Sequence, residues 1–461
     1  MNYSYDAIVI GAGTAGTYFA KLLAEQGYRV LVAEKDLKEK LGSRLDIFHI
    51  DKELFEKFGV PAPSATDEDY VSEFEFGISK SAFDRYPKYT RYPFVVMHLP
   101  LFLARLVGWA ESFGVEYAFG TEFVDFIYSG GTIQGAKLKQ GEKIFDLPAR
   151  LVADASGIKS VARSKLKEGY GVETFETGPD DKFYVILRYV KLKNPAADRL
   201  SYSTGWPFYK TWIAPQHDKD GAIIGVGANF SFDFAEEVYQ KFIAQIDLPP
   251  HELQYVEKGT TPYRRPPYSF VADGFVVLGD AACLTKPFSG EGITAAWGLC
   301  AIAAEEFTRA MRDGQYPDAK SVWNTNIRYQ RGQGAKFAYL MATLIGAVNS
   351  TAEENDYQFK KDIIFSEKDL TAMNRDFCVN LGPGDAIALV SKIVGGVLTK
   401  NISAAPVRSL LRSVKFAGRL QKHYENYPGD ITAYETWKQK ADNLWASAGT
   451  MADTVKLPGT G

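Results

Sequence analysis

A glycine-rich turn near the start of the chain has the residue types needed to hold a phosphate. The segment DAIVIGAGTAGTYFAKLLAEQGYRVLVAEKD predicts a strand, a turn, a helix over 14–26 and a second strand over 29–34. In the turn, Gly11, Gly13 and Gly16 allow a tight bend, a close approach of backbone to pyrophosphate and close packing of helix on strand. Free N–H groups at the helix start then face the anion. This order of elements predicts a dinucleotide-binding βαβ unit.

Three acidic residues each follow an apolar, strand-like run. Glu34 ends the second strand, where its carboxylate can accept hydrogen bonds from ribose hydroxyls and repels a 2′-phosphate, so FAD or NAD fits better than NADP. Asp154 and Asp280 end two later runs, and ligands of open α/β sheets bind at such strand ends. Asp280 suits ribitol hydroxyls, and the helix start at 289–293 suits the negative edge of a reduced flavin. NAD needs no such second anchor, which favours FAD.

The motifs together resemble the flavoproteins built like p-hydroxybenzoate hydroxylase. They are the glycine turn with Glu34, an Asp-x-x-Gly-x-x-Ser-x-x-Arg segment at 154–163, and the pair Gly279-Asp280. Within that group, GDAACLTKPFSGEGITAAWGLCAIAAEEF is similar to the geranylgeranyl reductase branch, whose members saturate polyprenyl double bonds with reduced FAD. The residues that the resemblance and the motifs assign to FAD are Gly11, Gly13, Thr14, Ala15, Gly16, Glu34, Lys35, Arg44, His98, Asp154, Gly157, Gly279, Asp280, Pro287, Gly290, Gly292 and Ile293.

The branch signature for the substrate wall is altered in this chain. The branch has Tyr-x-Trp-x-Phe-Pro followed by Gly-x-Gly, whereas here YKTWIAPQHDKDGAIIGVGAN puts Lys210 for Tyr and Ala214 for Phe. The smaller alanine widens a cavity wall, and the lysine brings a cation to it. The residues predicted to line the substrate cavity are Tyr209, Lys210, Trp212, Ala214 and Pro215.

Two further positions depart from the branch. Archaeal members carry a cysteine in the loop after the acidic ribose residue, but the loop here reads LGSRLDIFHID and places Arg44, Asp46 and His49 beside the expected flavin ring. Where the family often has an arginine ahead of a helix, this chain has His98.

The family's order predicts an α/β fold in three parts. A discontinuous Rossmann-like FAD-binding domain is expected at 1–80, 97–165 and 270–310. An antiparallel substrate sheet is expected at 81–96 and 166–269, where KFYVILRYVKL and GAIIGVGANFSF are rich in β-branched and aromatic residues. The remainder, 311–461, is predicted to be helical, with AKFAYLMATLIGAVNS and DAIALVSKIVGGVLTKN as core helices.

Composition narrows the class of protein. The 461 residues contain 53 Lys and Arg against 56 Asp and Glu, a net charge of −3, so no overall positive field favours nucleic acid. Three cysteines and five scattered histidines show no metal-ligand spacing, and no metal is predicted. No apolar run reaches the length of a membrane span, and the first strand leaves no room for a signal peptide. A cytoplasmic protein is therefore expected.

One late segment, VRSLLRSVKFAGRLQKH at 407–423, predicts a helix with a basic stripe beside an apolar one. Peripheral contact with an anionic membrane is one interpretation. An ordinary surface helix whose apolar stripe packs inward is the other, and it needs no partner.

These observations predict an FAD enzyme that reduces carbon–carbon double bonds of a lipophilic, isoprenoid molecule. Glu291 and Cys283 are the candidates for proton transfer, with water as an alternative. The electron donor, NAD(P)H or a reduced ferredoxin, stays open because no second glycine fingerprint is present. An FAD-dependent monooxygenase or halogenase is the alternative, since TWIAP is similar to the halogenase Trp-x-Trp-x-Ile-Pro signature. A non-enzymatic electron-transfer protein is a third hypothesis.

Overall fold

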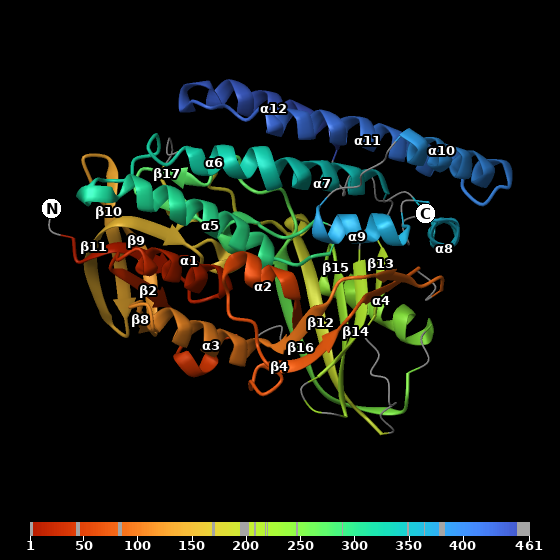
Figure 1. Ribbon diagram of the computed structural model, residues 1–461, viewed down its shortest axis with the longest axis horizontal. Coiled ribbons are helices and arrows are strands. Elements are labelled where there is room, and N and C mark those ends of the chain that lie inside the picture. Colours follow the sequence, from red (N-terminus) through yellow and green to blue (C-terminus); the bar gives the residue numbers. More distant parts are fainter. Residues whose placement is uncertain are drawn as a thin grey trace.

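Three sheets and a layer of helices make up the molecule (Figure 1). The computed structural model describes residues 3–42, 47–81, 85–167, 171–193, 202–206, 209–216, 218, 220–245, 248–287, 289–347, 350–363, 365–377 and 383–449. The predicted α/β fold, with a parallel sheet, an antiparallel sheet and a helical C-terminal region, is confirmed.

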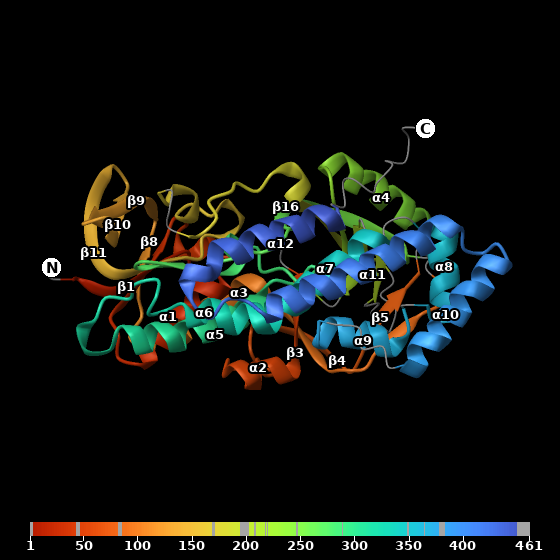
Figure 2. The same ribbon diagram turned by 90° about the horizontal axis from the view of Figure 1, so that it is seen from above.

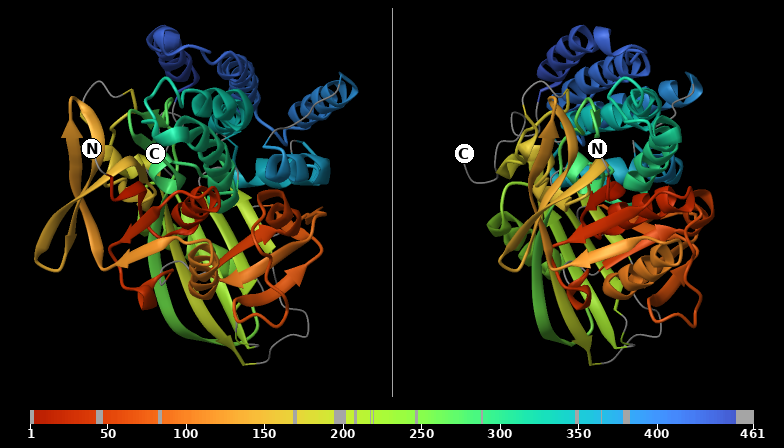
Figure 3. Two further views of the ribbon diagram at one scale, coloured as in Figure 1. Left: turned by 60° about the vertical axis from the view of Figure 1, so that its left-hand side comes forward. Right: turned by 90° about the vertical axis from the view of Figure 1, so that its left-hand side faces the viewer.

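The larger sheet carries the glycine turn. Its strand order is β17-β18-β11-β1-β2-β8, and β18, β11, β1, β2 and β8 run parallel. These strands span β1 Tyr5–Ile10, β2 Val30–Glu34, β8 Glu116–Phe119, β11 Lys143–Asp154, β17 Val271–Ala272 and β18 Phe275–Val277. The strands β9 (Thr121–Ser129) and β10 (Thr132–Gln140) extend β11 into the antiparallel meander at the left of Figure 3, left panel.

Helices cover this sheet because its central strands are largely apolar. Every residue of β2 is buried, as expected for a parallel strand that is covered on both faces. The helix α1 (Thr14–Glu25) contacts both α3 (Leu99–Glu111) and α5 (Ile293–Ala310). The carboxyl ends of β1, β2, β11 and β18 therefore meet at one edge, beside the start of α1.

The second sheet is antiparallel apart from one parallel pair. Its order is β16-β12-β15-β14-β13-β5-β6, with β13 and β5 parallel. The strands span β5 Gly77–Lys80, β6 Lys88–Thr90, β12 Lys182–Leu192, β13 Tyr202–Trp206, β14 Tyr209–Pro215, β15 Gly221–Ala228 and β16 His251–Pro262. The helix α4 (Phe232–Gln245) packs on β12, β14 and β15. A third, small sheet of β3 (Ile47–Asp51), β7 (Phe94–His98) and β4 (Tyr70–Phe74) lies with α2 (Lys52–Phe58).

The C-terminal helices form the outer layer seen from above in Figure 2. They span α6 Asn324–Tyr329, α7 Ala335–Ala347, α8 Ala352–Lys361, α9 Glu367–Arg375, α10 Pro383–Leu398, α11 Ala404–Glu425 and α12 Tyr434–Ala448. The helix α7 packs along α11 and is largely buried, as its sequence predicts. The prediction that α10 is a core helix is wrong, because Ile387 and Leu398 are 73% and 79% exposed.

The predicted division into lobes stays a proposal, at 1–80, 97–165 and 270–310 for the FAD-binding domain and 81–96 and 166–269 for the substrate domain. It is supported by the larger sheet, whose strands come from widely separated parts of the chain. Among the described helices, none is both long and apolar enough to cross a membrane.

Candidate functional site

The glycine turn after β1 is held by contacts that only glycine permits. A Cβ on Gly11, whose φ is +106°, would lie 2.5 Å from the carbonyl oxygen of Ala155. A Cβ on Gly16 would lie 2.1 Å from the carbonyl oxygen of Gly11. The space next to Gly13 is open, with no heavy atom within 4 Å of an added Cβ. Two glycines thus pack the turn against strand and helix, and the third leaves room for a phosphate at the start of α1.

Glu34 lies at the end of β2 next to this turn. Its buried carboxylate accepts hydrogen bonds from the backbone N–H groups of Ala12 and Asp36, each at 2.9 Å. A carboxylate offers about four lone-pair sites, so acceptor capacity remains on both oxygens. Glu34 can therefore fix the turn and still accept ribose hydroxyls.

The carboxylate of Asp154, at the end of β11, accepts hydrogen bonds from the loop that follows it. It is fully buried, and its two oxygens accept the backbone N–H groups of Ser156, Ala162 and Arg163. Burial raises the pKa of Asp154, which these hydrogen bonds oppose. Its direct contact with FAD stays a prediction, since the described interactions of the carboxylate are those that shape the loop.

The same loop holds the turn after β18. Ser160 Oγ and Arg163 Nε both donate to the carbonyl oxygen of Ala281, each at 3.0 Å. Ser160 and Arg163 are almost completely buried. The Asp-x-x-Gly-x-x-Ser-x-x-Arg motif therefore positions the Gly279-Asp280 turn from a segment more than a hundred residues away.

The carboxylate of Asp280 has the features of a ligand-binding group. No hydrogen bond to its side chain is found among the described residues, and burial raises its pKa to about 6. A Cβ on Gly292, directly before α5, would lie 3.1 Å from Asp280 Oδ1. Hydroxyl groups would satisfy this carboxylate, as the ribitol chain of FAD does in the predicted arrangement. Together with the open space at Gly13, this observation fits FAD.

An Asp280→Asn variant is expected to bind FAD about ten- to a hundredfold more weakly, because it loses a charged hydrogen-bond acceptor. At higher pH the apoprotein of this variant is also expected to be more stable than the wild-type apoprotein. Because the folded pKa of Asp280 lies above the unfolded value, the wild type loses stability as pH rises from about 4 to about 6, on the order of 3 kcal/mol. FAD titration and urea unfolding at several pH values check both effects. A stability difference between variant and wild type that does not change with pH would contradict the assignment.

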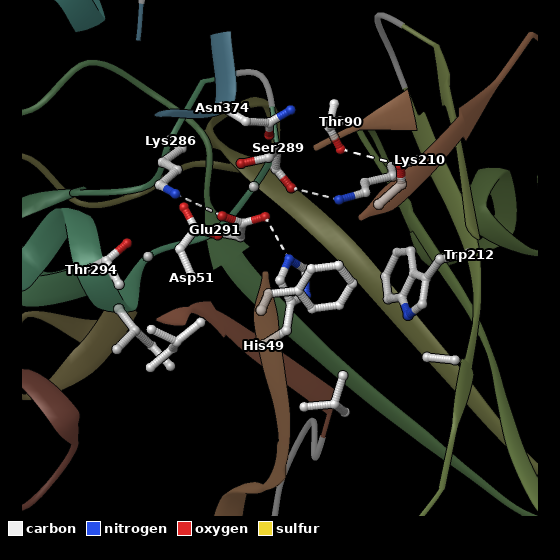
Figure 4. Close-up of a pocket in the computed structure, with 18 of the residues that line it drawn as sticks. His49, Asp51, Thr90, Lys210, Trp212, Lys286, Ser289, Glu291, Thr294 and Asn374 are labelled. Carbon is white, nitrogen blue, oxygen red and sulfur yellow. Dashed lines mark hydrogen bonds and ion pairs between the residues drawn. The ribbon is translucent and has the colours of Figure 1, made fainter. Parts of the chain in front are cut away.

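A cavity of about 340 Å³ lies between the start of α5 and the antiparallel sheet (Figure 4). One wall is apolar, and its members include Val185, Leu187, Trp212, Ile213, Ala214 and Phe94. The opposite side is polar, and its members include His49, Asp51, Lys210, Lys286, Ser289 and Glu291. The predicted flavin-binding segment supplies Gly290, Gly292 and Ile293 to the same cavity.

Glu291 is the centre of the polar side. Its carboxylate lies 2.8 Å from Lys286 Nζ and 3.2 Å from His49 Nε2, as the dashed lines in Figure 4 mark. Burial alone would raise the pKa of Glu291, but the charges of Lys286 and His49, with Lys210 beyond them, hold it well below its ordinary value. Glu291 is therefore a carboxylate at neutral pH and has no proton to give.

Two more ionisable groups complete the polar side. Burial raises the pKa of Asp51 to about 6, although the charge of Lys286 opposes the shift. Lys210 Nζ donates to the carbonyl oxygen of Ser289 at 3.1 Å, and burial lowers the pKa of this amine. Lys210 thus reaches from β14 to the loop before α5, and it lines the cavity together with Trp212 and Ala214.

Trp212 and its glycines form the apolar wall. Gly225 lies opposite Trp212 in the sheet, and a Cβ there would be 2.0 Å from Trp212 Cε2. A Cβ on Gly227 would meet its nearest atoms at 3.7 Å, an ordinary contact. The first glycine of the Gly-x-Gly pair therefore lets the indole ring lie over the strand. Ala214, which lies with Trp212 on β14, also lines the cavity.

Cys283 lies apart from these groups. The thiol is buried behind the Gly279-Asp280 turn and is not among the described residues that line the cavity. Burial raises its pKa to about 12, so the thiol is protonated and weakly reactive.

Several predicted cofactor residues have structural contacts of their own. The carbonyl groups of Thr14 and Ala15 accept hydrogen bonds from Trp297 Nε1 and Cys300 Sγ, which tie α1 to α5. The carbonyl oxygen of Pro287 accepts from the Tyr263 hydroxyl at 3.0 Å. The contacts of these residues with FAD stay predictions.

The remaining predicted residues are spread around the site. Lys35 pairs with Asp36 at 2.6 Å, His98 directly precedes α3, and Gly157 has a φ of +74° in the loop after β11. Pro215 ends β14 without lining the cavity. Arg44 and the side chain of Tyr209 lie outside the described residues.

Sequence patterns missed the ionic contacts around Glu291. His49 comes from β3, whereas Lys286 comes from the loop before α5, and no sequence spacing connects the two. The available signal was the loop after Glu34. It contains the polar residue His49 and lacks the cysteine that archaeal members of the branch carry in this loop.

Comparison with known proteins agrees with this geometry. The FAD binding domain family matches residues 4–227. The protein is an FAD-dependent oxidoreductase. The oxidoreductase is 24% identical over 455 residues to the digeranylgeranylglycerophospholipid reductase of Sulfolobus acidocaldarius, covering 95% of this chain and 97% of the relative. The resemblance to the geranylgeranyl reductase branch is thereby confirmed, and FAD is its cofactor.

Two other proteins show how widely the oxidoreductase fold is shared. A geranylgeranyl bacteriochlorophyll reductase-like protein from Thermoplasma acidophilum superposes with a TM-score of 0.72 at 18% identity, over 86% of this chain and 98% of that one. The 1H-pyrrole-2-carbonyl-(peptidyl-carrier protein) chlorinase of Pseudomonas fluorescens is 22% identical over 79% of this chain and 88% of its own. The oxidoreductase therefore shares its fold with reductases and shares sequence with a halogenating enzyme.

Proposed function

We propose that this oxidoreductase reduces carbon–carbon double bonds of a lipophilic, isoprenoid substrate. The observation that carries the proposal is the cavity, which has an apolar wall from β12 and β14 and a charged side next to the predicted flavin segment. An apolar wall suits a hydrocarbon chain, whereas the charged side suits proton delivery. The relatives named digeranylgeranylglycerophospholipid reductase support the same substrate class.

Reduced FAD, when bound, supplies a hydride to one carbon of the double bond. In the proposed reaction, His49 supplies the proton to the other carbon. Its Nε2 faces Glu291, and its Nδ1 has no hydrogen-bond partner among the described residues. The Nδ1–H bond breaks as the new C–H bond forms, and water returns the proton to the imidazole afterwards. Hydride and proton together account for the two hydrogens added.

Glu291 takes a positioning role in this scheme. Its carboxylate lies 3.2 Å from Nε2 and fixes the orientation of the imidazole, so that Nδ1 is the nitrogen left to donate the proton. Lys286 in turn compensates the carboxylate. Cys283, the other candidate for proton transfer, has no part in the scheme.

The test is anaerobic turnover with a dithionite-reduced enzyme. We expect prenylated lipids to gain mass in steps of one hydrogen pair per bond, with reoxidation of the flavin at the same rate. Prenylated lipids that leave the flavin reduced and are recovered unchanged would overturn the proposal.

A halogenase is the second candidate, favoured by the sequence similarity to the Pseudomonas fluorescens chlorinase. It predicts that the reduced enzyme turns over only when both oxygen and a halide are present. The anaerobic assay above separates the two, because a reductase needs neither.

The electron donor and the cellular location belong to the proposal as well. We propose an external donor, either NAD(P)H or a reduced ferredoxin, because the sequence contains one glycine fingerprint. We also propose a cytoplasmic enzyme whose α11 makes peripheral contact with the membrane that holds its substrate. Its five basic residues at 408–422 are all exposed.

A further inference from the structure

The helix α10 exposes a row of large apolar side chains. Ile387, Val390, Val394, Val397 and Leu398 are 73%, 55%, 49%, 38% and 79% exposed. Their spacings of three, four, three and one place them along one face of the helix. Scattered exposed apolar residues are ordinary on protein surfaces, whereas a continuous face of this kind marks an interaction site.

The next helix also exposes large apolar side chains. Leu411 and Val414 of α11 are 61% and 39% exposed. Figure 1 shows α10 and α11 following one another along the outer side of the molecule, and Figure 2 shows both helices from that side. The seven side chains are called the docking face below.

The chain around the docking face is strongly cationic. Residues 386–424 contain seven Lys and Arg and no Asp or Glu, in a chain whose net charge is −3. All seven are exposed, namely Lys392, Lys400, Arg408, Arg412, Lys415, Arg419 and Lys422. None of them forms an ion pair with a carboxylate of the described residues. Lys392 and Arg412 donate instead to backbone carbonyl groups.

Charge decides among the partners that an apolar face could have. A second copy of the chain packed on the same face across a two-fold axis would bring these unpaired cations against each other. An anionic bilayer offers both hydrocarbon for the apolar side chains and phosphate for the cations. We propose that the docking face binds an anionic membrane surface, with α10 as the element that enters the headgroup layer.

The location of α10 connects this contact to the cavity. Lys368 of α9 pairs with Asp385 of α10 at 2.8 Å, and Lys392 donates to the carbonyl oxygen of Asp362 after α8. Asn374 of α9 lines the cavity. The helix α10, which would contact the membrane, is therefore paired with α9, which borders the substrate site. The docking face specifies the peripheral membrane contact proposed above, and the delivery of a membrane lipid through it rests on the proposed function.

Co-sedimentation of the FAD-loaded full chain with vesicles tests the proposal. We expect binding to vesicles that contain phosphatidylglycerol, weak binding to pure phosphatidylcholine, and release at high salt. The double substitution Val390→Asp and Val394→Asp is expected to weaken binding at least about tenfold. Ile144→Asp is the matched control, because Ile144 is 55% exposed on the distant β11 and should leave binding unchanged.

The possible results are distinct. Wild type that does not bind anionic vesicles, or a double variant that binds as tightly, overturns the proposal. A lipid-free dimer that the double substitution converts to a monomer, seen by analytical ultracentrifugation, overturns it in favour of self-association. Wild type that binds vesicles but reduces no prenylated lipid leaves docking supported and refutes only the proposed reduction. Reduction of detergent-dispersed substrate without vesicle binding supports the proposed reduction and refutes docking.

Discussion

A His49→Gln variant is expected to lower turnover by about a hundredfold to ten thousandfold, the usual contribution of a general acid. Glutamine keeps a polar side chain near Glu291 but carries no transferable proton, while the apolar wall is untouched. The measurement is the anaerobic rate at which prenylated lipid reoxidises the reduced flavin, followed by absorbance in a single turnover. We expect the loss in kcat rather than in KM, because the proton is needed only in the reaction step.

The pH profile separates proton delivery from a merely structural role. We expect wild-type turnover to depend on pH in a way that His49→Gln turnover does not, because only the wild type carries the transferable proton at this position. Glu291→Gln should lower turnover, because the imidazole loses the carboxylate that fixes its orientation.

The control for these variants is Asn374→Ala, which alters the same cavity without removing a titratable group. It should change KM more than kcat and leave the shape of the pH profile intact. All variants should bind FAD as the wild type does, measured by flavin fluorescence. A His49→Gln enzyme with wild-type kcat would refute the assignment and leave water as the proton source.

The geometry of the predicted cofactor end could be anticipated because its residues are close in sequence or tied to strand ends. Gly11, Gly16 and Glu34 belong to one βαβ unit, whose local geometry dictates their types. Asp280 was assigned for a related reason, since an acid at the end of a parallel strand lies at the ligand edge of the sheet, and its contact with FAD stays a prediction.

The polar side of the cavity could not be predicted this way. His49 and Glu291 are 242 residues apart and meet only because the small sheet of β3 lies against the start of α5. No periodicity or spacing encodes that meeting, and single residues of this kind carry little signal on their own.

The error on α10 has a related cause. Its apolar residues repeat at helical spacing, which predicts that a face of the helix is covered but not what covers it. In the fold, α8 and α9 contact α10, while Val390 and Val394 stay 55% and 49% exposed in the described part of the chain. A buried helix and a helix with an exposed apolar face are therefore alike in sequence until the tertiary structure is known.

A Gly225→Ala variant is expected to lose about 1–3 kcal/mol of unfolding free energy and to displace Trp212 from its place on the sheet. The added Cβ would lie 2.0 Å from Trp212 Cε2, far inside any real contact, so the ring must move. Because Trp212 lines the cavity, its displacement changes the space left for substrate. Urea unfolding measures the stability, tryptophan fluorescence reports the ring, and KM for the prenylated lipid reports the cavity.

Gly227→Ala is the control from the same strand, where the nearest atoms to the added Cβ lie at 3.7 Å. Both substitutions remove one glycine from β15 and reduce the freedom of the unfolded chain equally. Any difference between them therefore measures the overlap with Trp212. Equal stability and equal KM for the two variants would show that the indole ring yields without cost, and the Gly-x-Gly pair would then need another explanation than support of the substrate wall.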